Sequence, residues 1–226
     1  MSFEALAERL DQVRATIAKL TPHPVTIVAV TKGFDTDAVR AALDAGLPDV
    51  GENRVQEALQ KQDELRDLTG ARWHLIGHLQ RNKARAIVGR FELVHSLDSL
   101  ELATELHRRS STPPPPPAQR VLLQVNVARE PQKSGCAPEE APALARDIAA
   151  LRSLRLEGLM TLAPFTDDVD VQRRTFRGLR VLRDRIKEEE GLWLGTLSMG
   201  MSGDYATAVA EGATVIRLGT ALFGPR

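Results

Sequence analysis

The fold is decided by one stretch near the start of the chain, Val25-Thr26-Ile27-Val28-Ala29-Val30-Thr31-Lys32. Seven β-compatible residues without a charge predict a strand, and a lysine closes it just before Gly33. An ammonium at the end of an apolar strand is costly to bury, so it either reaches solvent or takes part in chemistry. Lys32 is therefore either a cap on an exposed strand end or a candidate reactive amine.

The composition is that of an ordinary globular protein. The 226 residues are 42% hydrophobic and 27% charged, and 30 basic residues balance 30 acidic ones. This balance gives no sign of the basic surface typical of nucleic-acid or membrane binding. The one cysteine, Cys136, fits a reducing compartment, and we interpret it as an incidental thiol. With no signal peptide and no apolar run of about 18 residues, we expect a soluble, cytoplasmic protein.

Strand-like and helix-like segments alternate along the chain. Strands are predicted at residues 25–31, 49–50, 73–76, 93–95, 121–127, 156–162, 196–199 and 214–218. An amphipathic helix over 3–19 comes first, and further helices are predicted at 36–45, from about 54 to 68, at 83–88, from a cap at Asp98 to 109, and at 138–151, 169–189 and 205–211. Eight such βα units predict a single (β/α)₈ TIM barrel with an extra N-terminal helix, in one domain over 1–226. A doubly wound open sheet is the alternative. Residues 111–117, with five prolines, predict a polyproline II loop.

In such a barrel the active site lies at the carboxyl ends of the strands. The residues predicted there are largely polar, as a pocket with convergent polar groups requires: Lys32, Glu52, Asn53, His78, Asp98, Asn126, Met160, Thr161, residues 198–203, Gly219 and Thr220. Lys32 is therefore expected to point into the mouth of the barrel. A partly desolvated lysine there has a lowered pKa and can present a free amine to an aldehyde.

Two glycine-containing loops predict a phosphate site at the same mouth. Residues 198–204 (SMGMSGD) follow the seventh strand and lead into a helix, and Gly219-Thr220 follow the eighth. Small residues let backbone N–H groups approach an anion, and helix N-termini favour negative charge. Loops after strands seven and eight are where barrels often hold phosphate. Each loop alone could be an ordinary glycine turn, and the pair is the more specific signal.

A third feature is a charge inside the last strand. Arg217 lies in the run Thr214-Val215-Ile216-Arg217-Leu218, although a buried parallel strand is expected to be nearly all apolar. Alternation along the strand puts Arg217 on the same face as Val215 and Gly219. A permanent charge there needs a partner, and a structural salt bridge to Glu157 or Glu52 is the simplest alternative to a role in ligand binding.

A reactive lysine, a phosphate cradle and a cation between them describe a site for pyridoxal 5′-phosphate (PLP). Seven motifs carry a resemblance over essentially the whole chain: 29–32 (AVTK), 51–57 (GENRVQE), 73–83 (WHLIGHLQRNK), 133–135 (KSG), 158–161 (GLMT), 197–202 (LSMGMS) and 217–224 (RLGTALFG). Together they resemble the pyridoxal phosphate homeostasis protein family, whose fold matches the N-terminal barrel of alanine racemase.

The resemblance implies a role for each predicted site residue. Lys32 would form the internal aldimine with PLP, and Arg217 would face the pyridine nitrogen. Ser202, Gly203, Gly219 and Thr220 would hold the phosphate, and Asn53 and Met199 would line the ring. It also implies a monomer that supplies PLP to apo forms of PLP-dependent enzymes, and no metal. Two departures stand out: Arg54 replaces the tyrosine expected after Glu-Asn, and the five prolines look like an insertion on the barrel face opposite the site.

The same residues favour a carrier over a catalyst. We expect no counterpart of the racemase's second domain, which supplies a tyrosine base, because the chain closes at Arg226 after the eighth strand. A PLP-dependent amino-acid racemase or lyase would need a second acid or base near Lys32, and His78 and Tyr205 are the aromatic candidates. A class I aldolase would also use a barrel lysine, with a sugar phosphate and no cofactor. The reading we favour is intracellular PLP homeostasis without turnover.

Overall fold

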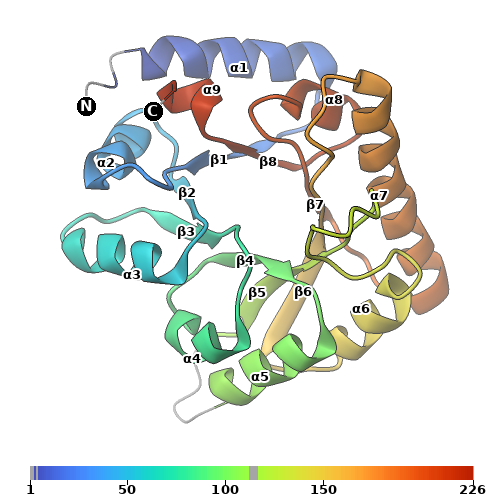
Figure 1. Ribbon diagram of the computed structural model, residues 1–226. Coiled ribbons are helices and arrows are strands. Elements are labelled where there is room, and N and C mark those ends of the chain that lie inside the picture. The colour runs from blue at the N-terminus through green and yellow to red at the C-terminus, as the bar shows by residue number, and fades with distance from the viewer. Residues whose placement is uncertain (1–2, 4, 112–116, 226) are drawn as a thin grey trace.

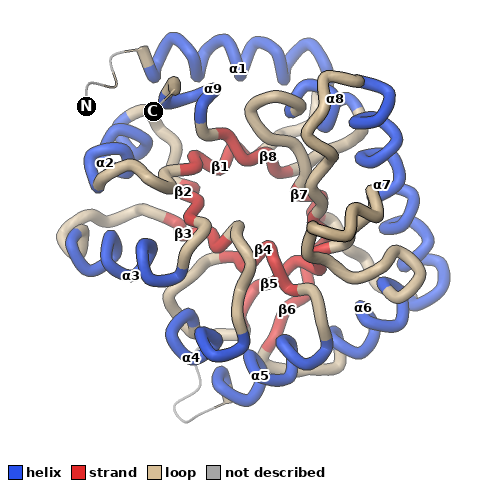
Figure 2. The backbone as a smooth tube through the Cα atoms, viewed as in Figure 1, coloured by secondary structure: helices blue, strands red, loops and turns tan. Residues whose placement is uncertain are grey.

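The described part of the chain is a closed parallel barrel surrounded by helices (Figures 1 and 2). The computed structural model describes residues 3, 5–111 and 117–225. Its strands are β1 (Thr26–Val30), β2 (Asp49–Glu52), β3 (Arg72–Leu75), β4 (Leu93–Leu97), β5 (Gln119–Gln124), β6 (Leu154–Met160), β7 (Thr196–Ser198) and β8 (Val215–Leu218). Each strand pairs in parallel with the next, and β8 pairs with β1. The predicted barrel is confirmed, and the open-sheet alternative is wrong.

Helices form the outer layer, one group after each strand. They are α1 (Leu6–Leu20), α2 (Thr36–Asp44), α3 (Val55–Glu64), η1 (Arg81–Lys83), α4 (Ala84–Ile87), α5 (Leu100–Ser110), α6 (Ala141–Ala149), α7 (Val169–Glu190), α8 (Tyr205–Ala210) and α9 (Thr220–Phe223). The expected N-terminal helix is α1, which packs against α8 and α9 beside β1 and β8 (Figure 1). It covers the part of the barrel that the short α9 leaves open.

Local sequence explains where the longer helices begin and end. Four apolar residues of α1 at helical spacing, Leu6, Leu10, Val13 and Ile17, are all buried against the barrel. Asp168 caps α7 by accepting hydrogen bonds from the N–H groups of Asp170 and Val171. The same helix ends at Gly191, whose φ of +69° is a left-handed conformation that suits glycine.

Three sequence expectations need correction. Ser99, not Asp98, caps α5, because the Ser99 hydroxyl accepts from the N–H of Leu102. The strand expected over 121–127 runs instead over Gln119–Gln124, since the chain after it folds into the loop that contains Asn126. A one-turn helix, α9, stands where a simple tail was expected. The predicted polyproline II loop falls largely on residues 112–116 and lies outside the described residues.

The core lies mainly between the barrel and the helices, and the barrel interior is unusually polar. Outward residues of the strands pack with the apolar helix faces in one large cluster. Inside the barrel, the apolar cluster is small and consists of Leu93, Leu122 and Met160. Barrel interiors are usually filled by branched apolar residues. The polar residues in this one are therefore the first place to look for function.

Gly158 on β6 is expected to tolerate no side chain. A Cβ added there would lie 1.9 Å from the carbonyl oxygen of Thr196, its partner on β7. Backbone atoms cannot swing aside, so Gly158→Ala is expected to lower the free energy of unfolding by about 1–3 kcal/mol or more. Urea denaturation measures the change. In the control Gly195→Ala, the added Cβ comes no closer than 3.5 Å to the indole nitrogen of Trp193. An equal loss of stability in both variants would contradict this reading of the strand contact.

Candidate functional site

Lys32 comes after Thr31, just beyond the last residue of β1, at the carboxyl end of the barrel. Thr31, before it, faces outward, because its hydroxyl donates to Glu52 Oε1 at 2.6 Å in the layer beneath α3. Lys32 itself is half-buried and lies in a turn. That its side chain points into the mouth of the barrel stays a prediction.

A buried ion cluster holds the backbone on both sides of Lys32. Lys61 on α3 donates from Nζ to the carbonyl oxygen of Thr31 at 2.8 Å, to Glu52 Oε1 at 2.7 Å and to Glu57 Oε1 at 3.1 Å. The N–H of Gly33 donates to the same Glu57 oxygen at 2.7 Å. All three ammonium protons of Lys61 therefore have acceptors, and residues 31 and 33 are both fixed.

Glu52 is the member of this cluster with an unpaired carboxylate oxygen. Its exposed fraction is 0%, and Oε2 has no hydrogen-bond partner among the described residues. Burial raises the pKa of Glu52, and the hydrogen bonds from Lys61 and Thr31 only partly oppose that shift. For Glu57 burial also acts to raise the pKa, but the Gly33 N–H and Lys61 outweigh it and lower the pKa.

Arg217 is a buried cation without a carboxylate in salt-bridge contact in the described structure. Its exposed fraction is 3%. It donates from Nη1 to Ser198 Oγ at 2.5 Å and from Nη2 to the carbonyl oxygen of Thr161 at 3.0 Å. The alternative of a structural salt bridge is wrong, because Glu157 pairs with Arg120 and Glu52 pairs with Lys61.

Keeping Arg217 charged in this buried position therefore costs free energy. Burial lowers the pKa of Arg217 to about 10, and the negative charge of Asp204 acts in the opposite direction. A guanidinium has five donors and no acceptor, so Arg217 can only offer hydrogen bonds to whatever meets it. A neutral acceptor or an anion at the mouth would suit it.

The loops after β7 and β8, where the anion cradle is predicted, contact each other. The N–H groups of Gly219 and Ala221 both donate to Ser202 Oγ, at 3.2 and 3.1 Å. The N–H of Met201 donates to Asp204 Oδ1 at 2.5 Å and closes the turn. Gly203 has open space around it, since an added Cβ would meet nothing within 4 Å. Two backbone donors are thus paired with the Ser202 hydroxyl oxygen at the start of α9, where Thr220 is exposed.

The contacts of Asn53 and Met199 with a ligand ring remain predictions, and the two residues lie in different surroundings. Asn53 is half-buried beyond β2, and its backbone packs so closely on Gly77 that a Cβ on Gly77 would come within 2.3 Å of the Asn53 carbonyl oxygen. Met199 is fully buried in the apolar cluster outside the barrel, opposite in alternation to Ser198. Its side chain is thus turned away from the interior, so a ring contact at this position would have to use the backbone.

Several polar residues of this site were missed in the sequence. Lys61 is an ordinary charged position on a polar helix until α3 packs over Glu52. His74 and His95 lie inside the barrel and are in hydrogen-bond contact with each other, and His95 also contacts Ser198, which the sequence had placed at the mouth. The strands β3 and β4 each contain a histidine among apolar residues. This pattern could have predicted polar side chains inside the barrel.

The two candidates for a second acid or base lie at the surface or against the core. His78 has a side chain that is 53% exposed, and its Nδ1 lies 3.5 Å from Asp98 Oδ2. Tyr205 is half-buried at the first position of α8 and packs on the hydrophobic cluster. Cys136 is buried, and burial raises the pKa of its thiol to about 12, which makes it unreactive.

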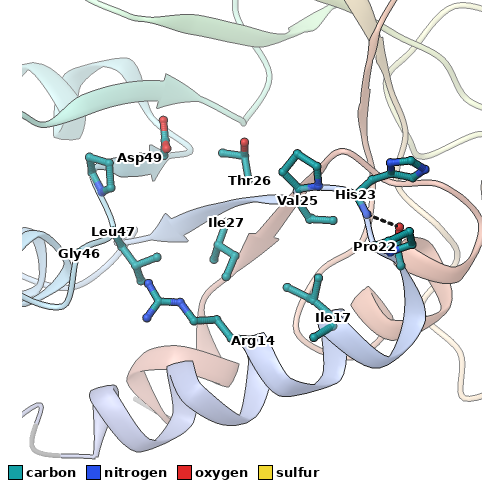
Figure 3. A pocket seen from close by; sticks show the side chains of 14 residues that line it. Arg14, Ile17, Pro22, His23, Val25, Thr26, Ile27, Gly46, Leu47 and Asp49 are labelled. Carbon is teal, nitrogen blue, oxygen red and sulfur yellow. Dashed lines mark hydrogen bonds between the residues drawn. The ribbon is translucent and has the colours of Figure 1, made fainter.

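A surface cavity lies at the opposite end of the barrel. It has a volume of about 530 Å³ and lies between α1, the residues before β1 and the turn before β2 (Figure 3). Its lining includes Arg14, His23 and Asp49 and none of the predicted site residues. The described residues hold no group of three or more His, Cys, Asp or Glu suited to a metal ion. No described helix is both long and apolar enough for a membrane span.

Comparison with known proteins identifies the family of this chain. A family model for the alanine racemase N-terminal domain matches residues 1–226. The pyridoxal phosphate homeostasis protein of Pseudomonas aeruginosa is 46% identical over 227 residues, covering 98% of this chain and 96% of that protein. The chain belongs to the pyridoxal phosphate homeostasis protein family. The resemblance seen in the motifs is confirmed.

Solved structures of this family share the barrel. PipY from Synechococcus elongatus, solved without PLP, is 40% identical with a TM-score of 0.88, covering 97% of this chain and all of PipY (100%). The PipY structure with PLP bound is 39% identical with a TM-score of 0.87. Alanine racemase from Corynebacterium glutamicum is 17% identical with a TM-score of 0.78 and is covered over 62% of its length, so that likeness concerns the fold alone.

Proposed function

We propose that this chain binds PLP at the carboxyl end of the barrel and holds it for intracellular supply. The observation that carries the proposal is that three complementary features come from three adjacent strands. Lys32 follows β1, Arg217 lies on β8, and the Ser202 cradle follows β7 and β8; β8 pairs with both of the others. An amine, a donor and an anion cradle on one rim match the aldehyde, ring nitrogen and phosphate of PLP.

Each group has a separate task in this proposal. PLP supplies an aldehyde that reacts reversibly with amines and a ring that can stabilise negative charge. Lys32 would supply the amine that condenses with the aldehyde, with loss of water, on a backbone held by Lys61. The Ser202 hydroxyl would bind the phosphate, and the N–H groups of Gly219 and Ala221, which donate to Ser202 Oγ in this structure, would turn to the phosphate, with Gly203 and Thr220 on the open side. Asn53 and the backbone at Met199 would border the ring.

Arg217 favours holding the cofactor over using it. It would donate to the pyridine nitrogen, and it has no acceptor for a hydrogen bond from a protonated ring nitrogen. A ring nitrogen that stays unprotonated makes a poorer electron sink than one paired with an aspartate. Relatives named as homeostasis proteins support a carrier.

The cell location and the partners extend the same proposal. The one cysteine is a buried free thiol, which agrees with a reducing compartment such as the cytoplasm. We take the acceptors of PLP to be apo forms of PLP-dependent enzymes, reached by a monomer whose site is open on the rim of the barrel.

A loading and transfer experiment tests this function. Purified protein is incubated with PLP, freed of excess ligand and mixed with an apo PLP-dependent enzyme, and the enzyme's recovered activity is followed. We expect stoichiometric loading, transfer of PLP and no turnover of amino acids by the carrier alone. Racemisation or elimination of an amino acid by the loaded protein would favour the alternative, a PLP-dependent racemase or lyase with the alanine racemase fold. Failure to load would reject both.

A further inference from the structure

A continuous line of hydrogen-bonded side chains runs through the barrel interior. Asp49 Oδ1 lies 2.9 Å from His74 Nε2, and His74 Nδ1 lies 2.9 Å from His95 Nε2. His95 Nδ1 lies 2.8 Å from Ser198 Oγ, which accepts the 2.5 Å bond from Arg217. All five residues are buried. The line begins at Asp49, which borders the cavity at the far end of the barrel (Figure 3), and ends at Arg217.

The charge of Asp49 fixes the direction of the first bond in this line. Burial acts to raise the pKa of Asp49, but hydrogen bonds from Arg72, at 2.8 and 2.5 Å, and from His74 lower it to about 2. Asp49 is therefore an anion that can only accept. His74 must donate to it from Nε2, and in a neutral His74 ring Nδ1 is then an acceptor.

The same logic continues to the other end. His95 must donate from Nε2 to His74 Nδ1, so His95 Nδ1 is an acceptor for the Ser198 hydroxyl. The Ser198 proton is thus used, and its oxygen meets Arg217 as an acceptor. A second proton on His95 is disfavoured, because burial above all, and also the charge of Arg217, places its pKa well below the usual value. His95 is therefore neutral, and hydrogen on its Nε2 matches a His74 that accepts at Nδ1.

We propose that Asp49, His74, His95 and Ser198 are positioning residues for Arg217, and that their one-way line of hydrogen bonds holds its guanidinium where it meets the pyridine nitrogen of PLP. The inference rests on the proposed function. A buried arginine without a carboxylate partner needs fixed acceptors to stay in place. Ser198 Oγ is one acceptor and the carbonyl oxygen of Thr161 is the other. Thr161 is held in place by the hydrogen bond from its hydroxyl to the Val125 carbonyl oxygen at 2.8 Å.

The first test reads the tautomers directly in the protein without PLP. The chain has five histidines, and ¹⁵N NMR of their imidazoles separates the protonated from the unprotonated nitrogen. We expect His95 to stay neutral with hydrogen on Nε2 between about pH 5 and 8, and His74 Nδ1 to accept the bond from it. The charges that face the line are Asp49, Arg72 and Arg120 at one end and Arg217 at the other, and Arg217 opposes a second proton on His95. Hydrogen on His95 Nδ1, or a second proton on His95 in that range, would overturn the proposal.

The variant Asp49→Asn tests transmission along the line. An asparagine amide can donate as well as accept a hydrogen bond, so His74 no longer has to donate to residue 49. We then expect a mixture of tautomers at His95, although residue 49 does not touch His95. Unchanged His95 signals beside altered His74 signals would show that no direction is transmitted and overturn the proposal. Ser153→Ala is the matched control, because it removes another Ser–His contact, 2.6 Å from Ser153 Oγ to His107 Nδ1, outside the barrel.

PLP binding completes the experiment. Ser198→Ala is expected to weaken PLP binding on the order of tenfold, the effect of one lost charge-assisted hydrogen bond, and to shift the pH profile of the bound chromophore. Ser198→Thr keeps the hydroxyl and is expected to restore both. Binding and pH profile like those of the wild type in Ser198→Ala, or no restoration by threonine, would overturn the positioning role alone. A wild-type chain that takes up no PLP would overturn the proposed function together with this one, whatever the tautomers.

Discussion

Replacing Lys32 by alanine is expected to abolish covalent uptake of PLP completely. The wild-type protein should gain a visible absorption band on incubation with PLP, and borohydride should convert the adduct into a stable modification of the peptide that contains Lys32. Alanine has no amine, so Lys32→Ala should show neither the band nor the modified peptide. The phosphate cradle and Arg217 remain, so weak non-covalent binding of PLP is expected to persist in this variant.

Lys83 offers the matched control for this experiment. It is a half-buried lysine on η1, after β3, at the same end of the barrel. Lys83→Ala should load and trap PLP like the wild type, because aldehydes react with many surface amines only weakly and reversibly. Trapping at Lys83 or at scattered lysines, with Lys32→Ala unaffected, would assign the reactive amine elsewhere.

Replacing Lys61 by methionine is expected to cause the largest loss of stability among single charge removals. Lys61 is 5% exposed and is in contact with the fully buried Glu52. Without it, Glu52 is a buried charge whose remaining side-chain donor is the Thr31 hydroxyl. Breaking a buried pair from one side typically costs about 3–5 kcal/mol. Urea denaturation at neutral pH should show this loss for Lys61→Met.

The pH dependence of that loss has a definite sign. The pKa of Glu52 is already raised in the folded protein, and removal of Lys61 raises it further. A carboxyl with a raised folded pKa adds stability below its unfolded pKa, and this contribution is lost as the pH rises through the folded pKa. The deficit of Lys61→Met should therefore shrink on acidification and grow towards neutral pH.

Two further variants isolate the buried charge as the cause. Glu52→Gln combined with Lys61→Met removes both charges and should recover most of the lost stability. Arg185→Met breaks the exposed Arg185–Glu189 pair on α7 and should change stability by less than about 0.5 kcal/mol. A deficit of Lys61→Met that is independent of pH and persists in the double variant would point to lost packing instead of an unpaired charge.

The sequence was enough to predict the barrel because each element carries its own local signal. Apolar strands bounded by glycine, and amphipathic helices between them, recur eight times, and the rule that active sites lie at the carboxyl ends of strands then selects Lys32 and the two glycine loops. Arg217 was visible as a charge in a strand that is otherwise apolar. Its true acceptors, Ser198 and the Thr161 carbonyl, come from β7 and the end of β6, far away in the sequence.

The remaining features depend on packing between distant segments. Nothing local marks Lys61 as buried, because α3 is a polar helix whose inner face is decided by its contact with Glu52 and Thr31. The line from Asp49 to Ser198 needs the barrel to close, since its members come from β2, β3, β4 and β7. Ser99 and Asp98 were equally good caps by residue type, and only the backbone path into α5 decides between them.

The most direct test of the central claim is a crystal structure of this chain with PLP, without borohydride treatment. We predict continuous density from Lys32 Nζ to the aldehyde carbon, the phosphate within hydrogen-bond reach of the Gly219 and Ala221 N–H groups and Ser202, and the pyridine nitrogen facing Arg217. PLP bound elsewhere, for example in the cavity beside Arg14 and His23 at the opposite end of the barrel, with Lys32 unmodified, would contradict the proposed site and the function built on it.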